Sequence, residues 1–326
     1  MAQNKTPLRY PGGKQKLTPF VLEIIRANGL EGGHYVEPYA GGAGVAMELL
    51  VAGHVNQIHL NDSSLPIYAL WNSILTHTEE FCRRISRALL NVEEWKDYRE
   101  IMRNPNDHSE LDVGFATFYL NRTNRSGVLS AGVIGGLDQA GKWKIDARFP
   151  RNELIRRIEL IGGFRDSITL LNLDAEQIIT DYIPTLPENT LTYCDPPYFE
   201  KASKLYLNHY APNDHERIAG IIQQQRDKKW IVSYDGVAQI LGYYANRRKF
   251  LYELQYNAAR AYKGNEVFIF SDNLVVPRNS VLPHIAVALK ANTRKLHQPA
   301  EIARLITRAA RLDNLRQTNK NLSRAV

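Results

Sequence analysis

The chain has 326 residues, of which 23% are charged and 44% hydrophobic, a composition typical of a globular protein with a sizeable core. This length suits one large domain, or one domain that carries an insertion. The formal net charge of +7 suits a polyanionic partner, although charge alone does not distinguish such a protein from one that is merely basic.

Cysteine content and hydropathy exclude several classes of protein. The two cysteines, Cys82 and Cys194, lie far apart in the sequence, so neither a disulfide framework nor a zinc site is indicated. No segment approaches the roughly 18 apolar residues of a membrane span, and the polar start MAQNKTPLRY does not have the pattern of a signal peptide. We therefore expect a cytoplasmic protein without a membrane partner.

Short apolar segments alternate with helical segments along most of the chain. Residues 44–53 and 215–229 have helical patterns, and each lies between two strand-like segments, which predicts an α/β fold with a mainly parallel sheet. The last two strand-like segments are joined by the short link 258–265, which predicts an antiparallel hairpin. The strand-like segments are residues 34–39, 57–62, 167–174, 190–195, 229–235, 252–257 and 266–271.

One internal region departs from this alternation. From residue 75 to 160, two polar helices precede a segment rich in Gly, Asn and Arg, and a structureless loop of this length is improbable. We therefore predict that residues 75–160 form a helical subdomain, inserted into a sheet domain of residues 1–74 and 161–289.

The end of the sequence also differs in composition. Residues 290–326 form a basic C-terminal extension with nine Lys or Arg and two acidic residues. Apolar residues fall on one face of a predicted helix, and Arg304, Arg308 and Arg311 fall on the other. A docking helix with a solvated basic face and direct contact with nucleic acid are both open at this point.

Four predicted strands end on residues that suit ligand binding, which occurs at the carboxyl ends of strands in open α/β sheets. Glu37 begins a glycine turn, EPYAGGAG, that opens a helix, and Asp62 follows the next strand. Asp174 and Asp195 end two further strands. This pattern predicts a pocket for an adenosine-like ligand, but it does not distinguish a nicotinamide cofactor from S-adenosylmethionine.

Five motifs occur in an order that is typical of one enzyme family. In these motifs, across about residues 7 to 275, the chain resembles the Dam-like DNA adenine-N6 methyltransferases. The motifs are RYPGGK (9–14), VEPYAGGAG (36–44), LND (60–62), FYLNRTNRSG (118–127) and TYCDPPY (192–198).

The resemblance implies both a fold and an activity. The fold is a Rossmann-like S-adenosylmethionine methyltransferase sheet, with the insertion as a helical target-recognition subdomain. The activity is site-specific methyl transfer from S-adenosylmethionine to the N6 amine of a flipped adenine in double-stranded DNA.

The catalytic assignments follow from the DPPY motif. Adenine's exocyclic amine is a poor nucleophile because its lone pair is delocalised into the ring, and two preorganised acceptors make it more electron-rich. Asp195 offers a carboxylate oxygen and Pro196 a backbone carbonyl, while Tyr198 would stack on the extruded base. No metal or covalent intermediate is required.

The resemblance also implies a set of cofactor-binding residues. Lys14 would lie near the carboxylate of S-adenosylmethionine, with a surface role as the alternative. Glu37 would face either the amino group of the cofactor or the water molecules around the glycine turn. Asp62 would bind the ribose hydroxyls, and Asp174 the adenine amine unless it only caps a helix. The full set is Tyr10, Lys14, Glu37, Tyr39, Gly41, Asp62, Asp174 and Asp195.

The predicted insertion carries the candidate DNA contacts. Arg122, Asn124 and Arg125 have the side chains that pair with guanine and adenine in the major groove. Lys142 and Lys144 are expected to hold phosphates, which position the protein without specifying sequence. A solvated surface role is the alternative for each of these residues.

The sequence also departs from the family pattern. Ala43 stands where many relatives have a glycine, and residues 123–136 do not match the reader segment of the GATC-methylating enzymes, so the recognition sequence stays open. Residues 233–235 resemble the family's Ser-x-x-Asp loop near the flipped base.

Alternatives to a DNA methylase remain at this point. A related enzyme could act on RNA adenine or protein glutamine, and a catalytically weak DNA-binding subunit of a defence system could keep the same fold. A nicotinamide oxidoreductase is disfavoured by the lack of a full Gly-x-Gly-x-x-Gly motif. We expect a monomer when the protein is alone, and a restriction or defence-system partner protein stays open.

Overall fold

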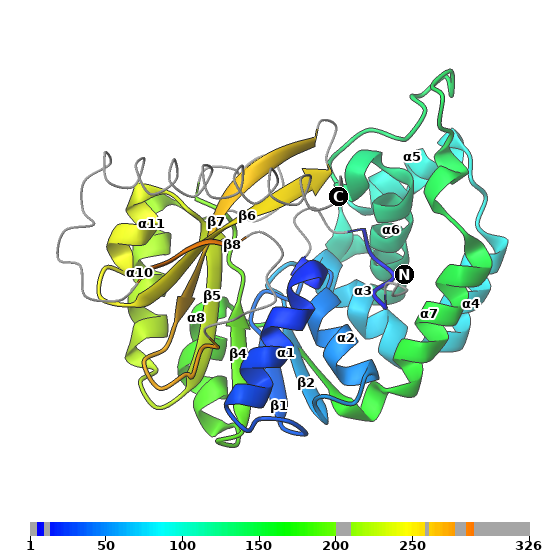
Figure 1. Ribbon diagram of the computed structural model, residues 1–326. Helices are drawn as coiled ribbons and strands as arrows, with labels where there is room; N and C mark the ends of the chain where they lie inside the picture. The colour runs from blue at the N-terminus through cyan, green and yellow to red at the C-terminus, as the bar shows by residue number, and fades with distance from the viewer. Residues whose placement is uncertain (1–4, 10–13, 200–209, 258–260, 278–284, 290–326) are drawn as a thin grey trace, which may run out of the picture.

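A single large sheet dominates the structure, with helices on both faces and a further group of helices beside α3 (Figure 1). The expectations for Tyr10 and for residues 290–326 lie outside the part of the chain that is described. None of the helices within that part is long and apolar enough to cross a membrane. The computed structural model describes residues 5–9, 14–199, 210–257, 261–277 and 285–289.

Eight strands form this sheet in the order β3-β2-β1-β4-β5-β7-β6-β8. The neighbours from β3 to β5 are parallel, whereas the pairs β5–β7, β7–β6 and β6–β8 are antiparallel. The predicted α/β fold, with its mainly parallel sheet and its C-terminal antiparallel hairpin, is therefore confirmed. The strands are β1 (His34–Glu37), β2 (Gln57–Asn61), β3 (Ile168–Leu171), β4 (Thr190–Cys194), β5 (Lys229–Asp235), β6 (Arg248–Asn257), β7 (Ala261–Phe270) and β8 (Ile285–Leu289).

The hairpin is longer than the sequence predicts. β6 and β7 stay paired from Arg248 opposite Phe270 to Asn257 opposite Ala261, so residues 261–265 of the predicted link belong to a strand. Backbone pairing does not require an apolar pattern, which explains why this polar segment was missed. The sequence also did not predict β8. This strand has only five residues, and its pairing with β6, which depends on the tertiary structure, is what identifies it.

Side chains of the central strands alternate between two cores, as the two-residue period of a strand requires. Tyr193 and Ile231 pack in the core that contains helices α1 to α3, whereas Cys194 and Val232 pack in the core that contains α8, α10 and α11. The helices are α1 (Thr18–Ala27), α2 (Gly44–Val51), α3 (Leu65–Thr76), α8 (Ala175–Gln177), α10 (Pro212–Gln224) and α11 (Ala238–Tyr243).

Four further helices occupy most of residues 78–163: α4 (Thr78–Arg87), α5 (Val92–Ile101), α6 (Glu110–Thr123) and α7 (Arg151–Gly163). Every α6 residue from Val113 to Thr123 is buried, so this helix forms the centre of the group. A Cβ atom at Gly114 would lie only 2.5 Å from the carbonyl oxygen of Ala69 in α3. The lack of a side chain at Gly114 therefore allows α6 to pack closely against α3.

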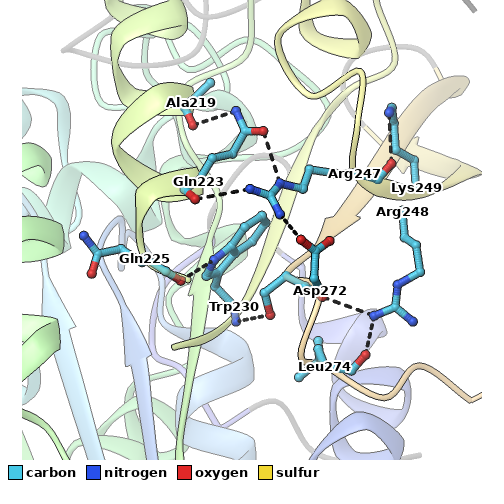
Figure 2. A network of polar contacts seen from close by, with 10 residues as sticks. Ala219, Gln223, Gln225, Trp230, Arg247, Arg248, Lys249, Asp272 and Leu274 are labelled. Atoms are coloured by element: carbon cyan, nitrogen blue, oxygen red, sulfur yellow. Dashed lines mark hydrogen bonds and ion pairs between the residues drawn. The ribbon is translucent and has the colours of Figure 1, made fainter. Parts of the chain in front are cut away.

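A polar network holds the start of β6 against α10 and the end of β7 (Figure 2). Arg247 donates to the side-chain and backbone oxygens of Gln223, both at 3.2 Å, and pairs with Asp272. Arg248 donates to the carbonyl oxygens of Ser271, at 3.1 Å, and Leu274. These bonds stabilise the antiparallel strands at the end of the sheet remote from the Asp235–Glu266 pair of β5 and β7.

Candidate active site

The topological switch point of the sheet lies between β1 and β4. The two strands are parallel neighbours, but the chain leaves β1 toward β2 on one side and returns to β4 on the other. Ligands bind outside the carboxyl ends of the strands at such a point. Glu37 ends β1 and Asp195 follows β4, so the structure brings two predicted site residues to this edge.

The glycine turn after β1 is held by Asp62. Gly41 and Ala43 have φ angles of 46° and 45°, in the left-handed region, and α2 begins at Gly44. Asp62 Oδ2 accepts from the Gly41 N–H at 2.9 Å, and its Oδ1 accepts from the Ser64 N–H at 3.0 Å. Burial raises the pKa of Asp62 to about 6. Asp62, which follows β2, is therefore hydrogen-bonded to the glycine turn that follows β1.

Glu37 is buried beside the first turn of α2. Its Oε1 accepts from the Ala46 N–H at 3.2 Å, and burial raises its pKa to about 8. This rise favours the protonated form of Glu37, which can donate a hydrogen bond as well as accept one.

The remaining predicted cofactor residues, Tyr39 and Asp174, follow β1 and β3. The Tyr39 hydroxyl lies 3.0 Å from the hydroxyl of Tyr210. Asp174 is exposed and caps α8, because its Oδ1 accepts from the Glu176 N–H at 2.8 Å. The helix-capping role that the sequence left open for Asp174 is therefore present, and contact with a cofactor stays a prediction.

Asp195 is held by residues of β5. Its Oδ1 accepts from Ser233 Oγ at 2.5 Å, and Ser233 Oγ accepts from the Tyr193 hydroxyl at 2.9 Å. The Phe199 N–H donates to Asp235 Oδ1 at 2.9 Å. Ser233 therefore holds the first residue of the DPPY segment, and Asp235 holds the residue that follows the segment.

Asp195 and Tyr198 of this segment join three buried residues in a polar group, which we name the lysine–carboxylate cluster: Lys14, Asp195, Tyr198, Tyr252 and Glu266. Lys14 Nζ lies 3.2 Å from Asp195 Oδ1 and 3.3 Å from Glu266 Oε2. Lys14 Nζ also donates to the Tyr198 hydroxyl at 2.5 Å. The Tyr198 hydroxyl donates to Glu266 Oε1 at 2.6 Å, and the Tyr252 hydroxyl donates to Glu266 Oε2 at 2.5 Å.

The cluster gives Lys14 and Tyr198 protein contacts that the sequence did not predict, and their expected roles toward the cofactor and the base stay predictions. Lys14 was expected beside the carboxylate of a cofactor, but its buried ammonium is directed at two protein carboxylates, since a buried charge requires such partners. Tyr198 was expected to stack on a base, but its ring is buried in this structure. Pro196, which follows Asp195 directly, is buried as well.

Sequence reasoning missed Glu266 and Tyr252. Strand pairing places Glu266 opposite Asp235 of β5 and opposite Tyr252 of β6, so three separate strands bring these residues together. The one signal in the sequence is an acidic residue at the start of an otherwise apolar strand, residues 266–271. An acid at that position suggests a buried partner but does not identify it.

Two of the predicted DNA-binding residues are directed into the protein. Arg122 is buried and its Nε donates to the carbonyl oxygen of Arg148 at 2.7 Å. Asn124 is buried and its Oδ1 accepts from Trp95 Nε1 at 2.7 Å. The expectation that Arg122 and Asn124 read base edges is therefore not supported by their placement, whereas Arg125 is exposed.

The loop that carries Lys142 and Lys144 presents basic and aromatic side chains to solvent. Both lysines and Arg148 are exposed, and Trp143 between the lysines is 61% exposed. Lys142 Nζ and Arg148 Cζ lie 5.8 and 6.0 Å from the centre of the Trp143 ring. Gln139 holds the loop, with its Nε2 donating to the Ile134 carbonyl at 2.8 Å and its Oε1 accepting from the Ile145 N–H at 2.9 Å.

Comparison with known proteins identifies one family. The family model described as D12 class N6 adenine-specific DNA methyltransferase matches residues 10–263, which is most of the chain. No curated protein matches it. Within the described ranges, no three His, Cys, Asp or Glu side chains are grouped as metal ligands would be.

Proposed function

Since the chain belongs to the D12 class of N6 adenine-specific DNA methyltransferases, we propose that it transfers a methyl group from S-adenosylmethionine to adenine N6 in double-stranded DNA. The observation that carries this proposal is the placement of Asp195. Its side chain is 24% exposed, follows β4 at the switch point of the sheet, and is fixed by Ser233.

The residues after β1 and β2 fit an adenosyl cofactor. The carboxyl groups of Glu37 and Asp62 provide acceptors for amine and hydroxyl groups. Gly41 adopts the left-handed backbone of the turn without adding a side chain there. We assign Asp62 to the ribose hydroxyls, Glu37 to the amino group, and Asp174 to the adenine amine. When bound, S-adenosylmethionine supplies an electrophilic methyl group on a sulfonium.

Asp195 and Pro196 activate the adenine amine in this proposal. One N–H donates to a carboxylate oxygen of Asp195 and the other to the carbonyl oxygen of Pro196, which makes the nitrogen lone pair more available. Bound S-adenosylmethionine would supply the methyl group, and the nitrogen that accepts it would gain a positive charge. The nitrogen then loses one proton to Asp195, which acts as the base.

Tyr198 provides an aromatic surface for the adenine. Enzymes that act on a duplex base extrude it from the helix, and they stack it on aromatic side chains. Lys14 and Glu266 hold the Tyr198 hydroxyl and so fix the direction of its ring. Because this ring is buried in the structure, stacking requires that the surrounding chain rearranges when DNA binds.

The DNA surface includes the exposed loop after α6. Lys142 and Lys144 contact phosphates, Arg125 is available for a base edge or a phosphate, and Trp143 provides an exposed ring for stacking. Arg122 and Asn124 act indirectly, since their inward hydrogen bonds shape the loop.

Transfer of labelled methyl from S-adenosylmethionine to duplex DNA tests this function. Wild type and Asp195→Ala would be compared, followed by nucleoside analysis and mapping of the modified sites. We expect N6-methyladenine from the wild type alone, with cofactor binding retained by the variant, and the map would give the recognition sequence.

Two controls separate the alternative functions. RNA of the same sequence tests whether RNA is the substrate. If the wild type binds cofactor and DNA but leaves both nucleic acids unmethylated, the protein is a DNA-binding subunit and the proposed function is wrong.

A further inference from the structure

Two carboxylates share one ammonium at the centre of the lysine–carboxylate cluster. The side chains of Lys14 and Glu266 are only 4% and 2% exposed, and they come from the segment before α1 and from β7. Asp195, the third charged member, is 24% exposed and faces the proposed reaction. Lys14 therefore connects the proposed catalytic carboxylate to a second carboxylate that lies deeper in the protein.

The hydrogen bonds define the charge of Glu266. The Tyr198 and Tyr252 hydroxyls both donate to its carboxylate, and the Lys14 ammonium can only donate. Burial and the charge of Asp195 raise the pKa of Glu266, whereas the charge of Lys14 and the two hydroxyl donors oppose that rise. An ionised Glu266 satisfies all three donors, so Lys14, Asp195 and Glu266 together carry a net charge of −1.

This net charge affects the proposed methyl transfer. A lone ammonium 3.2 Å from Asp195 Oδ1 would compete with the adenine amine for the carboxylate. It would also oppose the positive charge that the nitrogen gains in the transition state. A second carboxylate, 3.3 Å from the same ammonium, offsets both effects because the interior screens charges weakly.

We propose that Glu266 is a positioning residue for methyl transfer: it offsets the charge of Lys14, so that Asp195 stays available to the amine. The inference rests on the proposed function, and it adds to that function a residue that does not contact the substrate. Two further acidic groups lie in this region: Glu37, at the end of β1, is close enough to Asp195 for their charges to affect each other, and Asp235 of β5 accepts from the Phe199 N–H.

A charge-rescue experiment tests this role. Single-turnover methyl transfer would be measured for the wild type, Glu266→Gln, Lys14→Met and the double variant. The net charge of the three positions is −1 in the wild type, 0 in Glu266→Gln, −2 in Lys14→Met and −1 again in the double variant.

We expect Glu266→Gln to slow the chemical step roughly 10- to 100-fold, while affinity for S-adenosylmethionine changes by less than about threefold. The double variant should react at least about tenfold faster than Glu266→Gln, because removal of Lys14 restores the net charge. Glu216→Gln, at an exposed position of α10, is the matched control and should react like the wild type.

Several outcomes would overturn the inference. It is wrong if Glu266→Gln reacts like the wild type, or if the two substitutions are additive, since a purely structural role gives no rescue. If Glu266→Gln does not fold, the methyl-transfer rate of the double variant tests the proposal alone. A rate more than about 100-fold below that of the wild type then contradicts it. Lack of DNA methylation by the wild type would instead refute the proposed function.

Discussion

Substitution of Ser233 by alanine tests how the protein holds its proposed catalytic carboxylate. Ser233 Oγ donates to Asp195 Oδ1 at 2.5 Å and accepts from the Tyr193 hydroxyl at 2.9 Å. Ser233→Ala therefore removes a hydrogen bond to a charged group and leaves the buried Tyr193 hydroxyl without this acceptor. Both changes follow from the loss of a single oxygen atom.

The two losses have different readouts. A hydrogen bond to a charged group contributes roughly 1.5–3 kcal/mol, so its loss at Asp195 should lower kcat about 10- to 100-fold. An unsatisfied buried hydroxyl costs about 1–3 kcal/mol, which should appear as a lower free energy of unfolding in a denaturant titration. Affinity for S-adenosylmethionine, measured by calorimetry, should change little, because Ser233 has no hydrogen bond with Glu37, Asp62 or Asp174, the residues assigned to individual groups of the cofactor.

The double variant Ser233→Ala, Tyr193→Phe separates the two effects. Removal of both polar partners should recover most of the stability, since no buried hydroxyl is left unsatisfied. It should not recover kcat, because Asp195 still lacks its donor. The single variant Tyr193→Phe serves as the control, with a smaller loss of kcat. If Tyr193→Phe lowers kcat as much as Ser233→Ala does, or if the double variant recovers kcat, this account of Asp195 is refuted.

Three further predictions concern the cofactor, the DNA surface and pH. Asp62→Asn should weaken S-adenosylmethionine binding roughly tenfold in calorimetry. Burial raises the pKa of Asp62 to about 6, so the affinity of the wild type for S-adenosylmethionine should fall as the pH drops below that value. Trp143→Ala should weaken DNA binding about tenfold, and removal of Lys142 or Lys144 should reduce the salt slope of binding by about 1. His59 has its pKa lowered to about 4 by burial and by His34, so the unfolded chain binds more protons between that value and 6.5. The free energy of unfolding should therefore fall by about 1–2 kcal/mol across this window as the pH is lowered, after allowance for solvent screening.

Matched variants control these measurements. Asp166→Asn changes an exposed acid and should leave cofactor affinity and its pH dependence as in the wild type. Leu89→Ala removes a side chain as exposed as Trp143, at 60%, and equal weakening of DNA binding by both variants would contradict a specific role for Trp143. For the pH prediction, His59→Gln should flatten the dependence of the free energy of unfolding on pH, whereas His54→Gln should not. If the pH dependence is unchanged in His59→Gln, its attribution to His59 is wrong.

The sequence by itself determined the parts of this protein that depend on local pattern. Apolar segments that end on glycine or acidic residues identified β1, β2 and β4 and placed Glu37, Asp62 and Asp195 at their carboxyl ends. This was possible because strand period, helix period and turn residues are local properties of the chain, and because parallel strands bring their carboxyl ends to one edge. The order of the motifs indicated the methyltransferase family, and the family-model match over residues 10–263 confirms that prediction.

Only the tertiary structure decided which side chains meet and which are buried. Lys14 and Glu266 lie 252 positions apart, and strand pairing through β5, β7 and β6 brings them together with Tyr252. Arg122 and Asn124 belong to a motif rich in DNA-binding residue types, but close packing around α6 directs both side chains inward. A residue's type states what it can bind, whereas its burial and the register of its strand decide what it does bind, and those depend on the whole fold.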